Sequence, residues 1–531
     1  MIKKFKLLTM VLLFVSSFNF CAKANLNSSE QRNKDENNIL EITLQSDKEK
    51  QKIHNFGASD SWSCQFVGKN WPMAKREKIA DLLFSTKMDQ KGNPVGIGLT
   101  AWRFYIGAGS AEQGSSSGIE DKWRRSECFL NSDGTYNWEK QKGQRWFLKA
   151  ARQRGVNQFL GYAISPPVHL TKNGKAYSSG GNSANIPQEN YDEYAEFLAR
   201  VVENIQKKDN IQFDYISPFN EPQWNWDDSS QEGSPWQNKE IHSVCNLLNE
   251  ELNKIDVDTK IEITEAAHIK YLYSDADKPD RGNQLEEFFS VSSENYLGDL
   301  DHIPAKIGGH SYFSTYPESK LRNTRQKLKN EIQTVDPNLE YWMTEYCILE
   351  DNKIIKGNGR NLGMKPALYM AGVIHSDLTI ANASAWQWWL AISPYDYKDG
   401  LVYIDKDVQN GQIFESKMLW ALGHYSRFIR PGMRRIGVLR NGERKKKVGF
   451  DKILISGYKT EEEERFVVVA VNQKYDSISV TLSQQNMPEG KKVKVYQTTS
   501  ESDENLTKMG NKNIGQQITL PPRSLVTMVI E

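Results

Sequence analysis

Segments with the apolar pattern of β-strands alternate with segments that have the amphipathic pattern of α-helices from residue 53 onward. This alternation is typical of parallel strands, because each parallel connection needs a crossover, usually a helix, to return the chain. Eight strands are expected, at residues 53–60, 98–106, 156–165, 213–221, 261–267, 307–312, 339–345 and 383–390. Helices are expected at residues 73–84, 139–154, 189–207, 238–254, 283–291, 320–335 and 362–378. We therefore predict an α/β fold with a (β/α)8 TIM barrel over residues 53–410.

The pattern changes from about residue 411 to short alternating strands, which predict an antiparallel β-sandwich over residues 411–531. Its strands are expected at residues 453–458, 465–471, 477–482, 492–496, 517–520 and 524–530. Near the other end of the chain, residues 39–44 alternate like a strand but have no partner close in sequence. We expect the segment 39–52 to cross over and join the C-terminal sandwich.

The N-terminus has the order of a secretory signal: lysines, an apolar stretch at residues 7–15, and small residues at 22–24. We predict that residues 1–24 are a signal peptide and that the polar residues 25–38 are a flexible tether. The protein would then be exported, to the periplasm or the extracellular space. Lipid attachment at Cys21 is the alternative, although small residues do not precede this cysteine.

Charge and cysteine content exclude several kinds of partner. The 531 residues carry 68 Lys and Arg against 67 Asp and Glu, so no global basic field attracts nucleic acid or an anionic membrane. No apolar run beyond the signal approaches the roughly 20 residues that cross a bilayer. The remaining cysteines are too scattered for a disulfide framework or a paired zinc motif, so we expect free thiols, no metal and no cofactor; they are Cys64, Cys128, Cys245 and Cys347.

Two glutamates stand where predicted strands end. Glu221 closes the fourth strand in the motif Asn-Glu-Pro, and Glu345 closes the seventh strand. Reactive groups of barrel enzymes collect at this end of the strands. Two carboxylates that face one sugar can cleave a glycosidic bond, and in the retaining reaction they lie about 5 to 5.5 Å apart, one protonated and one ionised. The 14 Trp and 22 Tyr supply rings on which sugar faces can stack, which favours a polysaccharide or oligosaccharide as the partner.

Other polar and aromatic side chains occupy the same strand ends. Asn220 can hydrogen-bond a sugar 2-hydroxyl or cap the loop. Arg103 can hold a carboxylate ionised, or form a purely structural ion pair. Trp386 and Trp388 share one face of their strand, and we expect Trp388 to be the platform under the sugar and Trp389 to pack in the core.

The Asn-Glu-Pro motif, together with a second Glu at the end of the seventh strand, resembles the clan of retaining (β/α)8 glycosidases. The resemblance implies that Glu221 is the acid/base and Glu345 the nucleophile. It also implies that His310 and Tyr312, which are two residues apart and share a face, orient the nucleophile, with the tyrosine hydroxyl as its direct partner.

Several longer motifs are similar to glycoside hydrolase family 30, whose barrel carries a side β-sandwich built from C-terminal strands and an N-terminal strand. Asp60 ends one of these motifs, and we expect it to support the site. The motifs are residues 56–60, 165–167, 217–222, 344–345 and 423–432.

Segments 101–112 and 123–138 look most like the endo-β-1,6-galactanase branch of this family. The likeness implies hydrolysis of β-1,6-linked galactan. His169 is a departure, because glucosylceramidase-like members carry Trp near this position, and it either contacts a sugar hydroxyl or satisfies its own loop. The alternatives are a β-1,6-glucanase, a xylanase, an exo-acting β-glycosidase and, in a different class, a noncatalytic glycan-binding protein.

Overall fold

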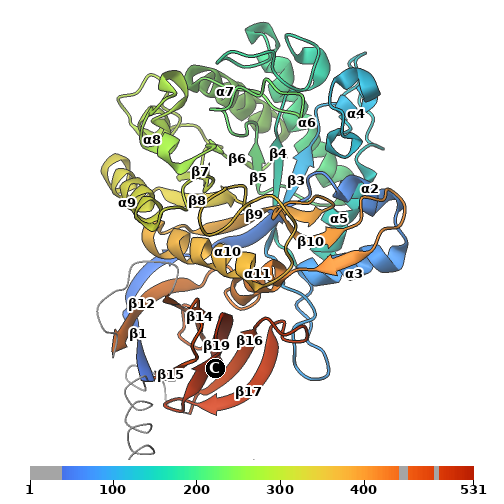
Figure 1. Cartoon of the computed structure of the whole chain (residues 1–531). Coiled ribbons are helices and arrows are strands. Elements are labelled where there is room, and N and C mark those ends of the chain that lie inside the picture. The colour runs from blue at the N-terminus through green and yellow to red at the C-terminus, as the bar shows by residue number, and fades with distance from the viewer. Residues whose placement is uncertain (1–38, 442–451, 484–489) are drawn as a thin grey trace, which may run out of the picture.

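The computed structural model describes residues 39–441, 452–483 and 490–531. The predicted signal peptide, the tether and Cys21 lie outside the described residues. The chain forms two sheets, and Figure 1 shows the sheet with its surrounding helices above and the second sheet below. Among the described residues, no helix has both the length and the apolar character needed to cross a membrane.

Eight parallel strands form the first sheet in a TIM-like arrangement. Hydrogen-bonded pairs join neighbours in the order of the chain, and the eighth strand pairs with the first. Beyond the fifth strand, Gly308 N donates to Ile263 O at 2.6 Å and His310 N donates to Ala266 O at 2.8 Å. The strands are β2 (Asn55–Ser59), β3 (Ala101–Ile106), β4 (Gln158–Ala163), β5 (Tyr215–Ser217), β6 (Lys260–Ile261), β7 (Lys306–His310), β8 (Glu340–Glu345) and β9 (Ala385–Ser393). Two further strands, β10 (Gly400–Ile404) and β11 (Ile413–Glu415), extend this sheet beside β9.

Helices follow the strands and lie outside the sheet (Figure 1). They are α2 (Cys64–Asn70), α3 (Met73–Phe84), α4 (Ser110–Gln113), α5 (Lys142–Gln153), α6 (Tyr191–Asp209), α7 (Asn238–Ile255), α8 (Gln284–Phe289), α9 (Glu318–Val335), α10 (Met364–Ser376) and α11 (Lys417–Ser426). Helix α7 shows why they form: Gln237 and Glu240 make a reciprocal capping box at its start. Its buried apolar side chains then recur at helical spacing and face the core; they are Ile241, Val244, Cys245, Leu248 and Leu252.

The second sheet is mostly antiparallel and contains nine strands in the order β17-β16-β19-β14-β13-β12-β1-β15-β18. The N-terminal strand joins it, pairing antiparallel with β12 and parallel with β15. The strands are β1 (Ile39–Lys52), β12 (Arg434–Asn441), β13 (Ile453–Lys459), β14 (Phe466–Asn472), β15 (Ile478–Leu482), β16 (Lys492–Thr498), β17 (Thr507–Asn513), β18 (Ile518–Leu520) and β19 (Ser524–Ile530).

The fifth strand of the first sheet is shorter than the expected 261–267. Regular pairing ends at Ile261, and Glu265 has a φ of 54°, which is incompatible with an extended strand. The chain therefore turns at this point, and the turn positions a side chain that is important in the site described below. The four predicted free cysteines are free and buried, as expected.

Candidate active site

Glu221 lies just beyond β5 in a left-handed backbone conformation, with a φ of 46°. Two backbone hydrogen bonds hold this conformation: Glu221 N donates to Glu265 O at 2.9 Å, and Trp224 N donates to Glu221 O at 3.0 Å. The residue is 8% exposed, so its carboxyl group is nearly buried.

Glu345 is the last residue of β8, and two side chains hold its carboxylate. Arg103 Nη1 donates to Glu345 Oε2 at 3.0 Å, and the Tyr312 hydroxyl donates to Glu345 Oε1 at 2.9 Å. Both contacts are those expected from the sequence. They favour the ionised form of this carboxylate, since a cation and a hydroxyl donor point at it.

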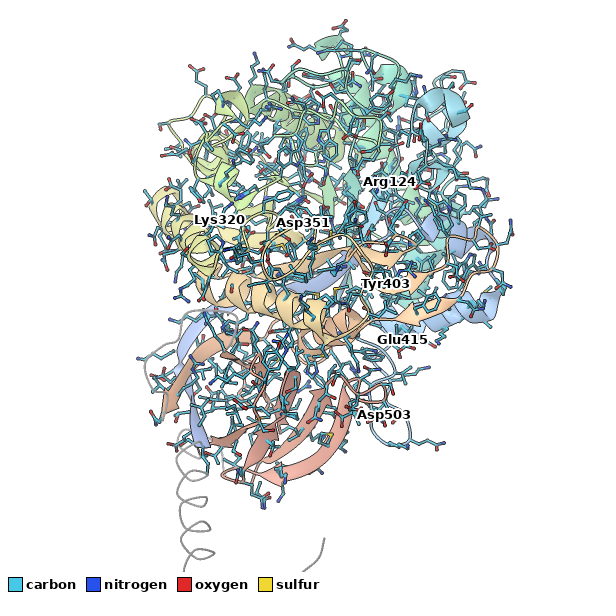
Figure 2. All side chains as sticks on the ribbon, in the orientation of Figure 1. Arg124, Lys320, Asp351, Tyr403, Glu415 and Asp503 are labelled. Atoms are coloured by element: carbon cyan, nitrogen blue, oxygen red, sulfur yellow. The ribbon has the colours of Figure 1, made fainter. Side chains whose placement is uncertain are left out.

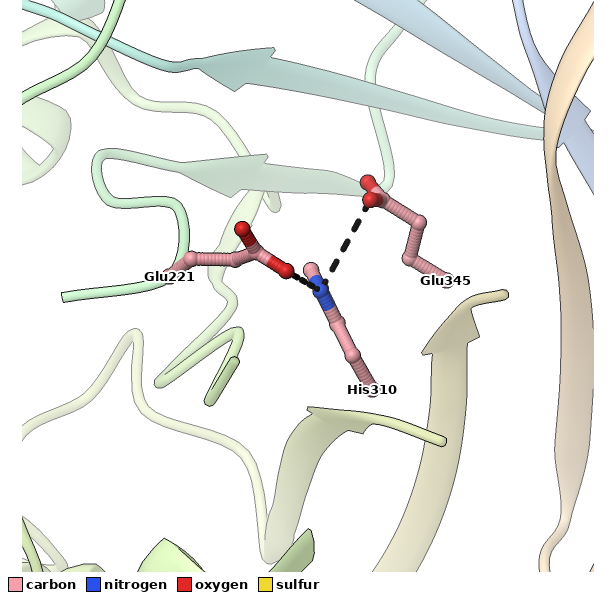
Figure 3. A group of neighbouring side chains, drawn as sticks. All are labelled: Glu221, His310 and Glu345. Atoms are coloured by element: carbon pink, nitrogen blue, oxygen red, sulfur yellow. Dashed lines mark hydrogen bonds and ion pairs between the residues drawn. The ribbon is translucent and has the colours of Figure 1, made fainter. Parts of the chain in front are cut away.

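His310, at the end of β7, connects the two glutamates (Figure 3). Its Nδ1 lies 3.0 Å from Glu221 Oε1 and 3.7 Å from Glu345 Oε1. Carboxylate oxygens of Glu221 and Glu345 lie within 4.8 Å of each other. The two strand ends therefore bring both acidic groups to one place in the sheet.

A third carboxylate, Glu265, completes the cluster and was not predicted. Its Oε2 accepts from Arg103 Nη2 at 2.7 Å and lies 3.1 Å from His310 Nε2. The only sequence signal was its position at the end of the fifth predicted strand, which it shares with Glu221 and Glu345. Periodicity alone cannot distinguish such a residue from an ordinary carboxylate after a strand.

Burial and neighbouring charges shift the pKa values of these groups in opposite directions. Burial raises the pKa of Glu221, although the hydrogen bond from His310 acts against this shift. Burial alone would raise the pKa of Glu265, but Arg103 and His310 lower it to about 2. Burial alone would lower the pKa of His310, but Glu345, Glu221 and Glu265 raise it to about 10. The site thus holds an imidazolium and an arginine among three carboxyl groups.

Glu221, His310 and Glu345 are close enough together to surround a metal ion. A metal ligand must be the neutral form of histidine with a free nitrogen. Both His310 nitrogens face carboxylates, and the raised pKa favours the doubly protonated ring. The donor set therefore fits a proton-bearing cluster better than a metal centre.

Three other predicted residues lie in buried or half-buried positions. Asn220 is 2% exposed, and its Oδ1 has no hydrogen-bond partner in the described part of the chain. Asp60 accepts from Tyr105 N at 2.8 Å, and burial raises its pKa well above the usual range. His169 is half-buried in the loop after β4, and burial lowers its pKa.

The structure contradicts the expected sugar platform at Trp388. Trp386 and Trp388 do share one face of β9, with ring centres 6.1 Å apart. That face points to the helix layer, because the Trp386 indole donates to Asp377 in the helical segment after α10 at 2.9 Å. Trp388 is 0% exposed, so its ring has no free face for a sugar. Trp389, on the opposite face, is 9% exposed and lies edge-on to Trp62 with ring centres 5.4 Å apart.

Arg124, which is labelled in Figure 2, adds a cation to this aromatic group. Its guanidinium lies 5.0 Å from the ring centres of both Trp62 and Tyr395. Residues 123–138 were among the segments that resemble the galactanase branch, and here they contact aromatic residues of two other loops.

Comparisons with known proteins agree with the fold. A model of O-glycosyl hydrolase family 30 matches residues 39–403. An endo-β-1,6-galactanase of Hypocrea rufa is 24% identical over 395 residues, which are 71% of this chain and 74% of that protein. The crystal structure of a conserved exported protein from Bacteroides fragilis has a TM-score of 0.84 and 35% identity, covering 92% of this chain and 99% of that chain. The catalytic domain of xylanase C from Talaromyces cellulolyticus has a TM-score of 0.65 and 22% identity, covering 92% of this chain and 100% of that chain.

The family match covers more than half of the chain, and the carboxyl groups described above lie at the ends of strands within the matched region. Enzymes of this family hydrolyse the bonds between sugars. The chain therefore belongs to glycoside hydrolase family 30 and is an O-glycosyl hydrolase.

Proposed function

We propose that the protein is a retaining β-glycosidase in which Glu221 is the acid/base and Glu345 is the nucleophile. The observation that carries this proposal is the separation of the two carboxyl groups, whose oxygens approach within 4.8 Å. Retaining enzymes place these groups about 5 to 5.5 Å apart, whereas inverting enzymes need roughly 6.5 to 9.5 Å to admit a water.

The environment of each carboxyl group suits its proposed role. Burial raises the pKa of Glu221, which favours the protonated form that can donate to the leaving oxygen. Glu345 receives hydrogen bonds from Arg103 and Tyr312 and attacks the anomeric carbon as a carboxylate. The bond to the leaving oxygen breaks, and this oxygen takes the Glu221 proton.

The second half of the reaction uses the same groups. Glu221, now ionised, takes a proton from water, and the resulting hydroxide displaces Glu345 from the anomeric carbon. Asn220 has a buried oxygen without a partner among the described residues, so it can accept a hydrogen bond from a sugar hydroxyl. The sugar then regains its original anomeric configuration.

For the substrate, we propose β-1,6-linked galactan, cleaved inside the chain. The support is the galactanase of Hypocrea rufa together with the galactanase-like segments 101–112 and 123–138. A xylanase of similar fold keeps β-linked xylan as the competing substrate, and β-1,6-glucan and exo-action remain alternatives. Hydrolysis of β-1,6-galacto-, β-1,6-gluco- and β-1,4-xylo-oligosaccharides, with product analysis, tests the choice; faster cleavage of a sugar other than galactose would reject galactan.

Substitution of each glutamate tests the roles. Glu345→Ala removes the nucleophile, so we expect no measurable turnover of any glycoside. Glu221→Gln removes the acid, so natural substrates should lose roughly 10²- to 10⁴-fold in kcat, and aryl glycosides with good leaving groups should lose much less. The control is Glu189→Gln, at an exposed position before α6. Turnover by Glu345→Ala, or galactan binding without any release of reducing sugar by the wild type, would contradict the catalytic proposal.

We also propose that the second sheet curls into a side β-sandwich. Its support is one apolar core that combines strands from both ends of the sheet order; examples are Val493 of β16, Met528 of β19, Leu482 of β15 and Leu520 of β18. We place the barrel at residues 53–433 and the sandwich at 39–52 and 434–531, because β11 pairs within the first sheet and thus moves the boundary beyond residue 410. Export of the protein is proposed from the signal-like N-terminus and from the exported relative of Bacteroides fragilis.

A further inference from the structure

Phe313 has an unusual combination of backbone conformation and exposure. It lies three residues beyond the end of β7, and its φ is 52°, in the left-handed region that bulky residues rarely adopt. Its backbone N–H donates to buried Glu350 Oε1 at 3.2 Å, which holds this conformation. The ring is 44% exposed, so burial of the ring does not account for the strained position. Strained backbone of this kind is concentrated at sites where function requires it.

The neighbours of Phe313 connect it to both carboxyl groups. The ring of Trp224 lies edge-on to it, with ring centres 6.5 Å apart and an angle of 86° between the planes. On another side, the ring of Tyr312 lies with its centre 6.3 Å from that of Phe313, and its hydroxyl binds Glu345.

Trp224 lies on the Glu221 side of the site. Its backbone N–H donates to Glu221 O, and a hydrogen bond from its side chain acts to lower the pKa of the Glu221 carboxyl group. Trp226, two residues on, also donates its indole N–H to Glu221 O, at 3.1 Å. A Cβ at Gly233 would lie 2.3 Å from the Trp226 ring, so the glycine lets the ring approach closely and fixes this wall.

We propose that Phe313 and Trp224 form the platform for the sugar residue on the leaving-group side of the scissile bond. The inference rests on the proposed function, in which Glu221 protonates the leaving oxygen. Side chains around the acid therefore border the departing sugar, whereas those around Arg103 border the nucleophile. Aromatic rings with one free face suit the apolar face of a pyranose, because they contribute contact area at low conformational cost. The platform selects substrates that continue past the cleavage point, as a polymer does.

Two substrates with the same glycone test the platform. One is a β-1,6-galacto-oligosaccharide, or the oligosaccharide that the wild type cleaves best. The other is the glycosyl fluoride of its glycone part, whose leaving group is fluoride and occupies no sugar platform. For Phe313→Ala, we expect kcat/KM on the oligosaccharide to fall about five- to tenfold more than kcat/KM on the fluoride, in line with the loss of one aromatic contact.

Phe313→Gly makes the test sharper, because glycine adopts a positive φ without strain. We expect this variant to unfold at the wild-type temperature or above, and still to lose activity selectively on the oligosaccharide. Phe313→Tyr keeps the ring and should restore the wild-type ratio of the two kcat/KM values. The matched control is Tyr475→Ala, which removes an aromatic ring that is 78% exposed and lies in the second sheet's loops.

The outcomes separate the two proposals. If the wild type hydrolyses both substrates and the Phe313 variants lose activity equally on both, the platform is wrong and the proposed function stands. If the wild type hydrolyses neither a β-linked oligosaccharide nor the fluoride, the proposed function itself is wrong. A ratio restored by tyrosine but not by glycine supports the platform.

Discussion

At the residue scale, Glu265 makes the two cations of the site possible. Arg103 and His310 are both fully buried, and a buried cation is costly unless a carboxylate meets it. Glu265 contacts both cations through one oxygen, and its backbone carbonyl accepts the N–H of Glu221. It therefore acts on the two proposed catalytic groups through their neighbours, without needing to contact a substrate. We regard Glu265 as a positioning residue.

Glu265→Gln should lower the pKa of His310 from about 10, because one of the anions that favour the imidazolium is removed. His310 contributes stability that is complete below pH 6.5 and is lost as the pH rises through about 10. Glu265 contributes stability above pH 4.5 that is lost as the pH falls through about 2. The difference in unfolding free energy between the wild type and this variant should thus be largest from pH 4.5 to 6.5.

Histidine side-chain NMR measures the first effect, and urea unfolding at several pH values measures the second. Glu340→Gln is a matched control, because it removes a carboxylate that hydrogen-bonds His54 at the opposite end of β8. An unchanged titration of His310 in Glu265→Gln would show that Glu345 and Glu221 suffice to hold the proton.

The sequence predicted the site well where a strand end identifies a residue, and less well where a face must be chosen. Glu221, Glu345 and Arg103 stand at the ends of apolar runs, and the structure brings them together. For Trp388 the period-2 pattern correctly gave a shared face with Trp386, but both faces of β9 are fully buried, so apolar character could not show which one meets the site.

At the element scale, α2 and α5 pack through a contact between two glycines. A Cβ at Gly68 would lie 2.1 Å from Gly143 O, and a Cβ at Gly143 would lie 2.1 Å from Gln65 O. No rotation of a side chain can relieve such a clash, since the opposing atoms belong to the backbone. This close contact seats α2 next to α5 on the outer side of the first sheet.

Gly68→Ala and Gly143→Ala should therefore each destabilise the protein by about 1–3 kcal/mol or more, as overpacking does, despite the better helix propensity of alanine. Chemical denaturation followed by circular dichroism measures the change. Gln153→Ala, at an exposed position of α5, is the control and should be neutral or slightly stabilising. Equal stabilities for all three variants would mean that the helices separate without cost.

Elements with strong apolar periodicity were predictable, and polar edge strands were not. Helix α3 was expected at 73–84 and has these bounds. Strand β17 was missed because it lies at the edge of the second sheet and has no fully buried residue, so its sequence has no alternation to detect. Strand β6 was overestimated because the turn at Glu265 depends on contacts with other strands.

At the scale of the whole molecule, α11 joins the two sheets. Lys417 near its start donates to the carbonyl oxygens of Glu501 and Glu504 in the loop after β16. His424 near its end lies 2.8 Å from Thr527 Oγ1 of β19 and 2.9 Å from Thr498 Oγ1 of β16. The helix follows the first sheet in the chain and binds the second sheet at both ends, so the two units are expected to unfold together.

His424 makes this junction sensitive to acid. It is fully buried, and burial lowers its pKa from 6.5 to about 3, so the folded protein keeps it neutral while the unfolded chain takes up a proton below about pH 6.5. Its contribution to stability is therefore present above pH 6.5 and is lost as the pH falls toward 3, by up to about 1.4 kcal/mol per pH unit. In His424→Gln, whose amide can still bond both threonines, the unfolding free energy should fall less steeply between about pH 4 and pH 6. Thr527→Ser keeps the hydroxyl at Nδ1 and should retain the wild-type slope; a slope unchanged by His424→Gln would mean that this histidine is protonated in the folded protein.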